Sequence, residues 1–303
     1  MSIESRPTSA PTSAPPLTRV RVGRATATVI GPNGRRRTEQ KVAGEEPLEI
    51  RLGGPGREPD TVNVTMRTPG DDFELAVGWC VSEGLLRLPL ALGEVKYCVR
   101  TPDALSEAEQ TRTPPPQNYN VVSVTSRTTI NGHSRRTQVT SASCGICGTE
   151  SLDALELTTP RVPADRGPAM AHAILMTLPD RLRAEQRTFT STGGTHAAGL
   201  FRSDGTTVVV REDIGRHNAV DKVIGHAAVA GFLPLDDHAL LVSGRVSFEI
   251  VQKAAMSGVG ILAAVSAPTT LAIDAADRMG ITLATFVRGD TATVWTHPHR
   301  ITP

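Results

Sequence analysis

The sequence predicts an α/β protein, in which a mixed β-sheet flanked by helices follows a smaller, β-rich N-terminal subdomain. After residue 190, short runs of small and β-branched apolar residues alternate with segments of helical spacing, a pattern typical of sheets buried on both faces. Before residue 142, alternating apolar and polar residues separated by Gly- and Pro-rich turns predict strands joined by hairpins. Aromatic residues make up only 3% of the chain, so the core must be built largely from Ala, Val, Leu and Ile.

The C-terminal part supplies the regular alternation. A hairpin is expected over 195–212 around Ser203-Asp204-Gly205. Upstream of it, residues 169–189 have helical spacing that Pro179 interrupts. Downstream of it, we expect a helix at 216–231, a strand at 238–244, a helix at 247–259, a strand at 260–267, a helix at 268–280 and strands at 281–289 and 291–297.

The N-terminal part predicts strands and one helix. The strands are expected at 19–30, 48–52, 61–68, 120–126 and 135–141. Residues 73–86 have helical spacing, with Asp71 or Asp72 as the N-cap. Cys80 is then a small core residue of this helix, and Cys98 is a strand residue.

Composition divides the chain and excludes some functions. Residues 1–17 predict a disordered, Pro/Ser/Thr-rich extension, residues 18–142 the β-rich subdomain, and residues 143–303 the α/β domain, preceded by the loop CGICG. The formal net charge is +1, which argues against general binding to nucleic acid or membranes. No export signal and no apolar run of about 20 residues is present, so we expect a cytoplasmic protein with reduced thiols.

The stretch SASCGICG places Cys144 and Cys147 three residues apart between glycines. A structural zinc site usually needs a second pair of ligands, and no second C-x-x-C is present, so we expect no bound metal. A thioredoxin-like dithiol usually begins a helix after the first strand of a βαβ unit, whereas this pair follows a predicted hairpin. Accessible thiols in a glycine-flanked loop favour a sulfur carrier that holds its cargo as a persulfide.

Three further motifs predict binding sites. The segment 212–222, EDIGRHNAVDK, gathers polar and charged groups at a helix start, where some are expected to bind or to catalyse. Two strand-to-helix turns, at SGRVSFE and SAPTTLA, offer backbone N–H groups to an anion, and Arg245 adds a guanidinium. His196 follows Gly193-Gly194 at a strand start, where glycine permits close approach to a ligand.

The hairpin after the strand at 281–289 is a fourth candidate. It offers the aromatic face of Phe286, the Arg288 guanidinium for a phosphate, Gly289 for close approach, and Asp290 as a hydrogen-bond acceptor. An ordinary turn explains the same residues equally well, because Arg-Gly-Asp-Thr is a good turn sequence.

Together these stretches resemble the formate dehydrogenase accessory sulfurtransferases, the FdhD family. The segments that carry the resemblance are MRTPGDDFELAVGWCVSEG (66–84), SCGICG (143–148), STGGTHAAG (191–199), EDIGRHNAVDK (212–222), SGRVSFE (243–249), SAPTTLA (266–272) and GITLATFVRG (280–289). They occur in order along the chain from about residue 17 to its end, and the main departure is the N-terminal extension.

The resemblance implies a sulfurtransferase that passes sulfur from a cysteine desulfurase to the bis-guanine-dinucleotide form of the molybdenum cofactor, for use by formate dehydrogenase. It implies that Cys144 carries the persulfide and that Cys147 assists. It also implies a homodimer and a fold similar to that of the cytidine deaminases, although the chain lacks their H-x-E and P-C-x-x-C signatures, so their zinc chemistry does not carry over. The segment that matches the family's cofactor-binding segment consists of Phe286, Val287, Arg288, Gly289, Asp290 and Thr291, and we add Arg245 and His196 from the strand-end turns.

Two alternatives keep the same residues. One is a non-catalytic chaperone that binds the cofactor or its client and uses the cysteines only for docking. The other is a cytosolic thiol oxidoreductase. Persulfide formation on the isolated protein distinguishes the sulfur carrier from both.

Overall fold

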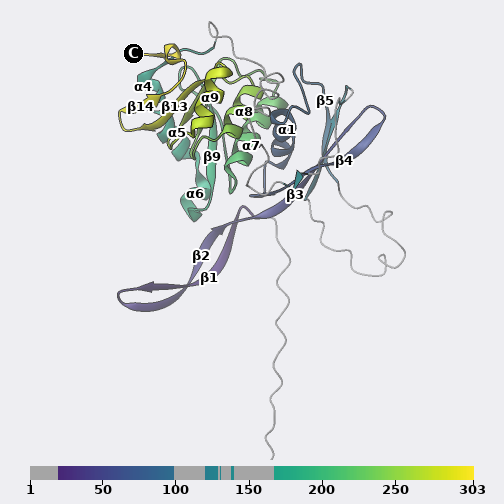
Figure 1. Ribbon diagram of the computed structural model, residues 1–303. Coiled ribbons are helices and arrows are strands. Elements are labelled where there is room, and N and C mark those ends of the chain that lie inside the picture. Colours follow the sequence, from purple (N-terminus) through teal and green to yellow (C-terminus); the bar gives the residue numbers. More distant parts are fainter. Residues whose placement is uncertain (1–19, 99–119, 129, 131–137, 140–166) are drawn as a thin grey trace, which may run out of the picture.

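The computed structural model describes residues 20–98, 120–128, 130, 138–139 and 167–303. In these residues the predicted fold class is confirmed, because a mixed sheet flanked by helices lies beside a smaller, strand-rich part (Figure 1). The likeness to cytidine deaminases stays a prediction. None of the helices in the described ranges combines the length and the apolar character that a membrane crossing requires.

The larger sheet has six strands in the order β10-β9-β11-β12-β13-β14. Their bounds are β9 His196–Arg202, β10 Thr207–Asp213, β11 His238–Val242, β12 Ile261–Ala264, β13 Thr282–Arg288 and β14 Thr291–Val294. The central strands β11, β12 and β13 are parallel, and hairpins add antiparallel strands at both sides. The predicted hairpin at Ser203-Asp204-Gly205 is the turn between β9 and β10.

Helices cover both faces of this sheet, which explains why its central strands are apolar throughout. In β11, Leu240 and Val242 belong to the core beneath α7 (Arg216–Val229), α8 (Phe248–Met256) and α9 (Thr270–Arg278). Ala239 and Leu241 belong to a second core beneath α4 (His172–Leu175) and α5 (Leu178–Glu185). The interruption expected at Pro179 is confirmed, because α5 begins at Leu178 with Pro179 in its first turn, and a further short helix, α6 (Arg187–Thr192), follows.

The smaller sheet has the order β5-β6-β3-β4-β7. Its strands are β3 Glu46–Gly54, β4 Arg57–Arg67, β5 Leu92–Tyr97, β6 Val121–Ser126 and β7 Gln138–Val139. Helix α1 (Asp72–Ser82) lies between this sheet and α7, and one continuous apolar core joins all three. The two helices approach so closely that a Cβ atom on Gly78 would overlap the carbonyl oxygen of Asp221, and one on Gly225 would overlap that of Glu74.

The start of α1 differs from the prediction. Asp71 is at the N-cap position but has a left-handed backbone, and its side chain makes no capping hydrogen bond. It instead forms an ion pair with Arg21 at 2.6 Å. The carboxylate of Asp72 points inward, where Arg67 donates two hydrogen bonds to it at 2.9 and 3.1 Å. Both acidic side chains are therefore used for tertiary ion pairs.

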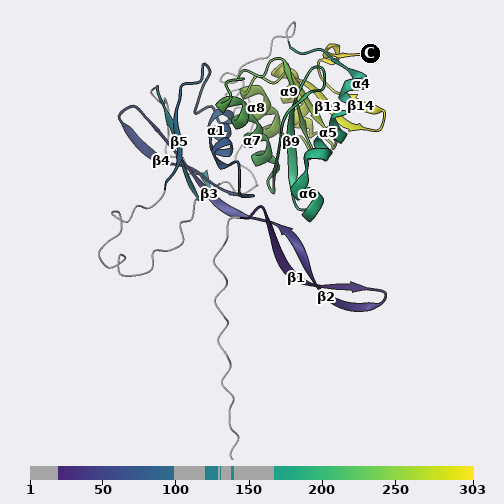
Figure 2. The same ribbon diagram turned by 180° about the vertical axis from the view of Figure 1, so that it is seen from behind.

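Strands β1 (Val22–Gly31) and β2 (Gly34–Ala43) form a separate two-stranded ribbon. In Figure 1 and in the opposite view of Figure 2, the ribbon leaves the body near α6, and its tip lies clear of every labelled element. At the other end of the chain, β15 (Ile301–Thr302) pairs with β8 (Met170–Ala171) after the short helix η2 (Pro298–Arg300).

Candidate functional site

Three loops meet at the carboxyl ends of the parallel strands. The backbone N–H of Val246, in the turn after β11, donates to the carbonyl of Ala267 in the turn after β12, at 3.1 Å. The N–H of Phe286, near the end of β13, donates to the carbonyl of Ser266 at 3.3 Å. Since parallel strands end at one edge of a sheet, such an edge is the usual ligand site of an open α/β fold. The structure therefore places the Arg245 turn and Phe286 on neighbouring loops of one edge.

His196 and the first turn of α7 lie at the same edge. The N–H of Ala197 donates to the Ser243 hydroxyl, and the N–H of Ser243 donates to the carbonyl of Ala197, both at 2.9 Å. A Cβ atom built on Gly244 would lie 3.5 Å from His196 Nδ1 and 3.7 Å from a side-chain carbon of Arg216. We call this set of loops (His196, Arg216–His217, Ser243–Ser247, Ser266 and the hairpin residues Phe286–Asp290) the strand-end site.

The two histidines of the strand-end site favour the neutral form. Burial and the Arg216 guanidinium lower the pKa of His196, and the carboxylate of Asp213 only partly opposes this. Burial, together with Arg216 and Lys253, lowers the pKa of His217 to about 4. The Nε2 atom of His217 lies 3.5 Å from the hydroxyl of Ser247, at the limit of a hydrogen bond. Neutral imidazoles retain a lone pair, so both rings can accept hydrogen bonds from a ligand.

Arg216 is incompletely satisfied. Its Nε is buried, and within the described residues no hydrogen-bond partner is found for it. Buried donors without a partner are rare and usually indicate a ligand, a water molecule or strain. Arg216 was one member of the predicted 212–222 cluster, and its position beside His196 and Gly244 distinguishes it from the other members.

Most of that cluster is structural. The carboxylate of Glu212 accepts from the N–H groups of Thr188 and Phe189 and from the hydroxyl of Thr195, at 2.7–2.8 Å, and so ties β10 to α6. Asp213 and Lys222 form a buried ion pair at 2.8 Å. Of the charged residues in the motif, only Arg216 and His217 belong to the strand-end site.

The hairpin between β13 and β14 has an unusual backbone at Phe286. Its φ of 53° is in the left-handed region, which aromatic residues rarely adopt, and the strand register shifts between Thr285 and Arg288. The guanidinium carbon of Arg288 lies 5.7 Å from the centre of the Phe286 ring. The residues from Arg288 to Thr291 are all exposed.

Val287 differs from its neighbours in the predicted binding segment. Its side chain is completely buried in the core beneath α4 and α5. It therefore has no surface to offer a ligand, and its contribution to the hairpin is packing. Arg288 lies over the Phe286 ring, whereas Val287 is buried in the core, so the two residues that flank Val287 are the ones placed to meet a ligand.

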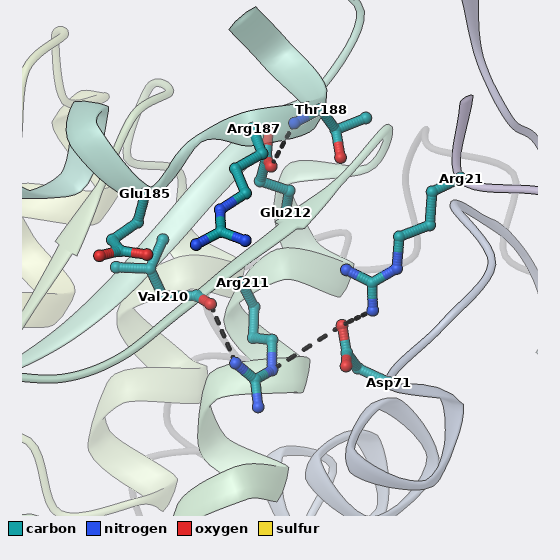
Figure 3. A pocket seen from close by; sticks show the side chains of 8 residues that line it. All are labelled: Arg21, Asp71, Glu185, Arg187, Thr188, Val210, Arg211 and Glu212. Atoms are coloured by element: carbon teal, nitrogen blue, oxygen red, sulfur yellow. Dashed lines mark hydrogen bonds and ion pairs between the residues drawn. The ribbon is translucent and has the colours of Figure 1, made fainter. Parts of the chain in front are cut away.

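A polar pocket of about 260 Å³ lies at the base of the ribbon (Figure 3). Its lining residues are Arg21, Asp71, Glu185, Arg187, Thr188, Val210, Arg211 and Glu212. Arg211 donates to Glu74 and lies 3.8 Å from Asp71, which in turn pairs with Arg21. Burial would raise the pKa of Glu74, but the hydrogen bonds from Arg211 and His226 outweigh it and lower that pKa. Most charges in this pocket thus already have partners within the protein.

Cys144 and Cys147 lie outside the described residues. The nearest described backbone before them is β7, which pairs in parallel with Asn63 and Val64 of β4. Cys80 is buried in the core, as predicted, and burial together with Asp221 and Glu83 raises its pKa. Cys98 follows β5 directly and donates its N–H to the carbonyl of Val121 at 2.9 Å. Among the described residues no group of three or more His, Cys, Asp and Glu side chains is arranged to hold a metal ion.

Comparisons with known proteins complete this description. The model of the FdhD/NarQ family matches residues 43–302. The chain is 47% identical over 261 residues to a protein of Streptomyces avermitilis named "Sulfur carrier protein FdhD", covering 85% of this chain and 87% of the relative. It is 38% identical over 275 residues to a protein of the same name from Picrophilus torridus, covering 91% and 97%. A solved structure described as a putative formate dehydrogenase accessory protein from Desulfotalea psychrophila has a similar fold, with a TM-score of 0.69 over 92% of this chain at 22% identity.

Proposed function

Because the chain belongs to the FdhD/NarQ family, we propose that it is a sulfurtransferase that receives sulfur from a cysteine desulfurase on Cys144 and supplies it to the bis-guanine-dinucleotide molybdenum cofactor used by formate dehydrogenase. Relatives that are 38–47% identical carry the name sulfur carrier protein, which supports the sulfur-transfer part of the proposal. The protein acts in the cytoplasm, as a homodimer, and the cofactor is its bound substrate.

The observation that carries the proposal is the position of β7. Strands β7 and β4 are parallel, and Val139 lies opposite Val64. The chain that leaves β7 therefore starts out in the direction of Thr65 and Met66, which follow Val64 in β4. Asn218, next to His217 in the first turn of α7, donates to the carbonyl of Met66 at 2.7 Å. Cys144 is the fifth residue after Val139, and an extended chain covers at most about 18 Å over those five steps. The chain from Val139 to Cys144 is thus attached within reach of the first turn of α7, which favours delivery of sulfur to the strand-end site.

Loading is a thiol–persulfide exchange. The Cys144 thiolate attacks the outer sulfur of the donor's persulfide, the donor's S–S bond breaks, and the donor cysteine leaves as a thiolate. The new S–S bond is in the Cys144 persulfide, and no net oxidation occurs. In release, the Cys147 thiolate attacks the inner sulfur, so that a Cys144–Cys147 disulfide forms and sulfide leaves. The two thiols supply the two electrons, and a dithiol reductant of the cell restores them.

The strand-end site supplies what the cofactor's nucleotide ends require. Arg245, Arg288 and Arg216, whose buried Nε has no partner among the described residues, offer guanidinium groups for the pyrophosphate. Phe286 offers a ring for guanine, and Asp290 an acceptor for its N–H groups. Neutral His196 beside Gly244 adds a hydrogen-bonding group where the absence of a side chain leaves room.

The test is activation of formate dehydrogenase by single-cysteine variants. Cys144→Ala should abolish activation while leaving the unfolding transition unchanged, since a thiol in a glycine-rich loop adds little packing. Cys147→Ala should be less severe, because the dithiol reductant of the cell can attack the Cys144 persulfide in place of Cys147 and release the sulfide. Full activity of the Cys144 variant together with loss in the Cys147 variant would reverse the roles. Full activity in both would exclude a persulfide relay and leave the chaperone function.

A further inference from the structure

The β1–β2 ribbon has no support from the rest of the described chain beyond its base. Every residue from Arg24 to Arg37 is exposed, and Ile30 near the tip is 70% exposed. Isolated two-stranded ribbons are marginally stable in water. A ribbon of two ten-residue strands whose outer end packs on none of the described residues is therefore expected to serve a contact with another molecule.

The register separates the ribbon into two unlike sides. Cross-strand partners share a side, and successive residues alternate between sides. One side carries the pairs Arg24–Lys41, Thr26–Glu39, Thr28–Arg37 and Ile30–Arg35. The other side carries the pairs Gly23–Val42, Ala25–Gln40, Ala27–Thr38 and Val29–Arg36. We call the first the basic side, because four of the ribbon's basic residues and its exposed Ile30 lie on it.

The charge of the ribbon contrasts with that of the remaining chain. Residues 20–43 contain six basic residues (Arg21, Arg24, Arg35, Arg36, Arg37 and Lys41) and one acidic residue, Glu39, giving +5. Subtracting this from the chain's +1 leaves −4 for all other residues. Arg24 pairs with Glu39 at 2.7 Å, whereas the described residues provide no ion-pair partner for Arg35, Arg37 or Lys41. These guanidinium and ammonium groups are available to an external acidic surface.

The base of the ribbon is fixed beside the strand-end site. The N–H of Gly44 donates to the carbonyl of Arg21 at 2.8 Å, and Arg21 is held by Asp71. A Cβ atom on Gly194 would lie 3.1 Å from the Cβ of Ala43, and β9 begins two residues later at His196. Both views show the ribbon leaving the body below α6 and the start of β9 (Figures 1 and 2). A molecule held along the ribbon thus lies next to the edge where His196 begins β9.

We infer that the basic side of the ribbon docks an acidic surface of the protein that receives the cofactor, and so holds that protein over the strand-end site. The identity of this partner as the cofactor's recipient rests on the proposed function. The ribbon has no aromatic residue on which a nucleic-acid base would stack, and its exposed Ile30 among arginines suits a protein interface. Two copies of the basic side would repel each other, which argues against pairing of two ribbons with each other.

The experiment measures binding of purified formate dehydrogenase, prepared without its cofactor, to the full-length protein by fluorescence anisotropy. The double variant Arg35→Glu/Arg37→Glu should weaken binding at least tenfold and remove most of its salt dependence, because two favourable charges become repulsive. The milder Arg35→Gln/Arg37→Gln should show a smaller loss in the same direction. The matched control is Arg57→Glu/Arg87→Glu, which changes the net charge equally on two exposed side chains outside the ribbon and should alter affinity less than about twofold.

A second pair of variants tests the side of the ribbon. Thr28→Glu adds one negative charge to the basic side, and Gln40→Glu adds one to the other side. Only the first should weaken binding. Equal affinity of all variants, or equal losses in the ribbon and control variants, would overturn the inference. So would tighter binding of a duplex DNA than of the enzyme, or a change from dimer to monomer in Arg35→Glu/Arg37→Glu with affinity for the enzyme unchanged.

Persulfide loading of Cys144 by the desulfurase is measured in parallel on the same variants. It should be the same in all of them, because loading does not use the ribbon. Absence of loading in the unaltered protein would contradict the proposed function, whereas normal loading with ribbon-independent binding of formate dehydrogenase would contradict the docking role alone.

Discussion

Two polar regions of the molecule use the same residue types for opposite purposes. Between the two sheets, Arg67 pairs with Asp72, Asp213 with Lys222, and Asp221 with Lys253, all of them buried. We call these three pairs the interior network. At the strand-end site, Arg216 keeps a buried N–H without a described partner, and the Arg245 and Arg288 side chains are exposed.

The two regions differ in how completely their polar groups are hydrogen-bonded within the protein. In the interior network each charge is surrounded by groups of the protein that complete its hydrogen bonds, as when Lys253 contacts Asp221, Glu83 and the Ser82 hydroxyl at 2.9–3.1 Å. Such pairs fix how α1, α7 and α8 meet. At the strand-end site, the Arg216 Nε has no partner among the described residues, and the neutral imidazoles of His196 and His217 can accept hydrogen bonds from a ligand. Polar groups without partners at the carboxyl ends of the strands are therefore a better indicator of a binding role than the paired charges of the interior network.

The largest effect on the free energy of unfolding is expected for a substitution in the interior network. Arg67→Met should lower the free energy of unfolding by about 3–5 kcal/mol, because it leaves the Asp72 carboxylate buried without its bidentate partner. Urea denaturation followed by circular dichroism measures this change. The matched control is Arg24→Met in the exposed pair with Glu39, which should cost about 0.5 kcal/mol or less. Similar losses in both would mean that the interior network does not hold the fold together.

A smaller, pH-dependent effect is expected at His217. The pKa of its folded form is about 4, below the unfolded value of about 6.5, so the unfolded chain binds a proton first as the pH falls. The stability that neutral His217 contributes is thus complete above about pH 6.5 and is lost as the pH falls toward 4. Arg216, Lys253, Glu249 and His196 act on this pKa besides burial.

His217→Asn removes this titration. We compare the free energy of unfolding of the variant with that of the unaltered protein at each pH. This difference should shift in favour of the variant by roughly 1–2 kcal/mol between pH 7.5 and pH 5, after allowance for partial solvent access. Burial raises the pKa of Asp221 to about 6, so protonation of Asp221 adds stability as the pH falls, opposite to the effect of His217. This contribution is the same in both proteins and cancels in the difference. A difference that does not vary between pH 7.5 and pH 5 would show that His217 is not held neutral.

The smallest effect on stability is expected at the hairpin between β13 and β14, where a substitution should mainly weaken nucleotide binding. Arg288→Ala should change the free energy of unfolding by less than about 0.5 kcal/mol, because the side chain is exposed. It should weaken binding of guanosine diphosphate roughly tenfold, by removal of a charge-assisted contact with phosphate. Isothermal titration calorimetry measures both this affinity and the weaker binding expected for adenosine diphosphate. An unchanged affinity would move the site to the turns that contain Arg245 and Pro268.

The sequence predicted the fold class well because periodicity and turn residues are local signals. The runs HALLV and ILAA are short, apolar and bounded by turns, which favours buried strands, and the hairpin at Ser203-Asp204-Gly205 follows from its turn residues. Asp71 was predicted correctly as an N-cap position of α1, but its side chain makes no capping hydrogen bond, because Arg21, fifty residues away, binds its carboxylate and no local pattern shows such a partner. The broken helix after residue 169 was partly foreseen at Pro179.

The site was predicted in part for the same reason. Glycine-rich turns and strand ends identified the segments of His196, Arg245 and Phe286, and the FdhD/NarQ family match confirms the resemblance drawn from them. The roles within the 212–222 motif were not separable, because Glu212 and Asp213 are distinguished from Arg216 only by what α6, β4 and α1 place beside them. Ser243 and Ser247 were not singled out, since a serine at a turn carries no signal of its partners.

The central claim is that Cys144 accepts sulfur, and mass spectrometry of the protein after incubation with a cysteine desulfurase and L-cysteine tests it most directly. The account predicts that the peptide containing Cys144 gains the mass of one sulfur atom, that a reductant removes it, and that Cys144→Ala abolishes the gain while Arg288→Ala leaves it intact. A protein that binds guanosine diphosphate but shows no added sulfur on Cys144 or Cys147 would contradict the account and would identify the chain as a cofactor chaperone.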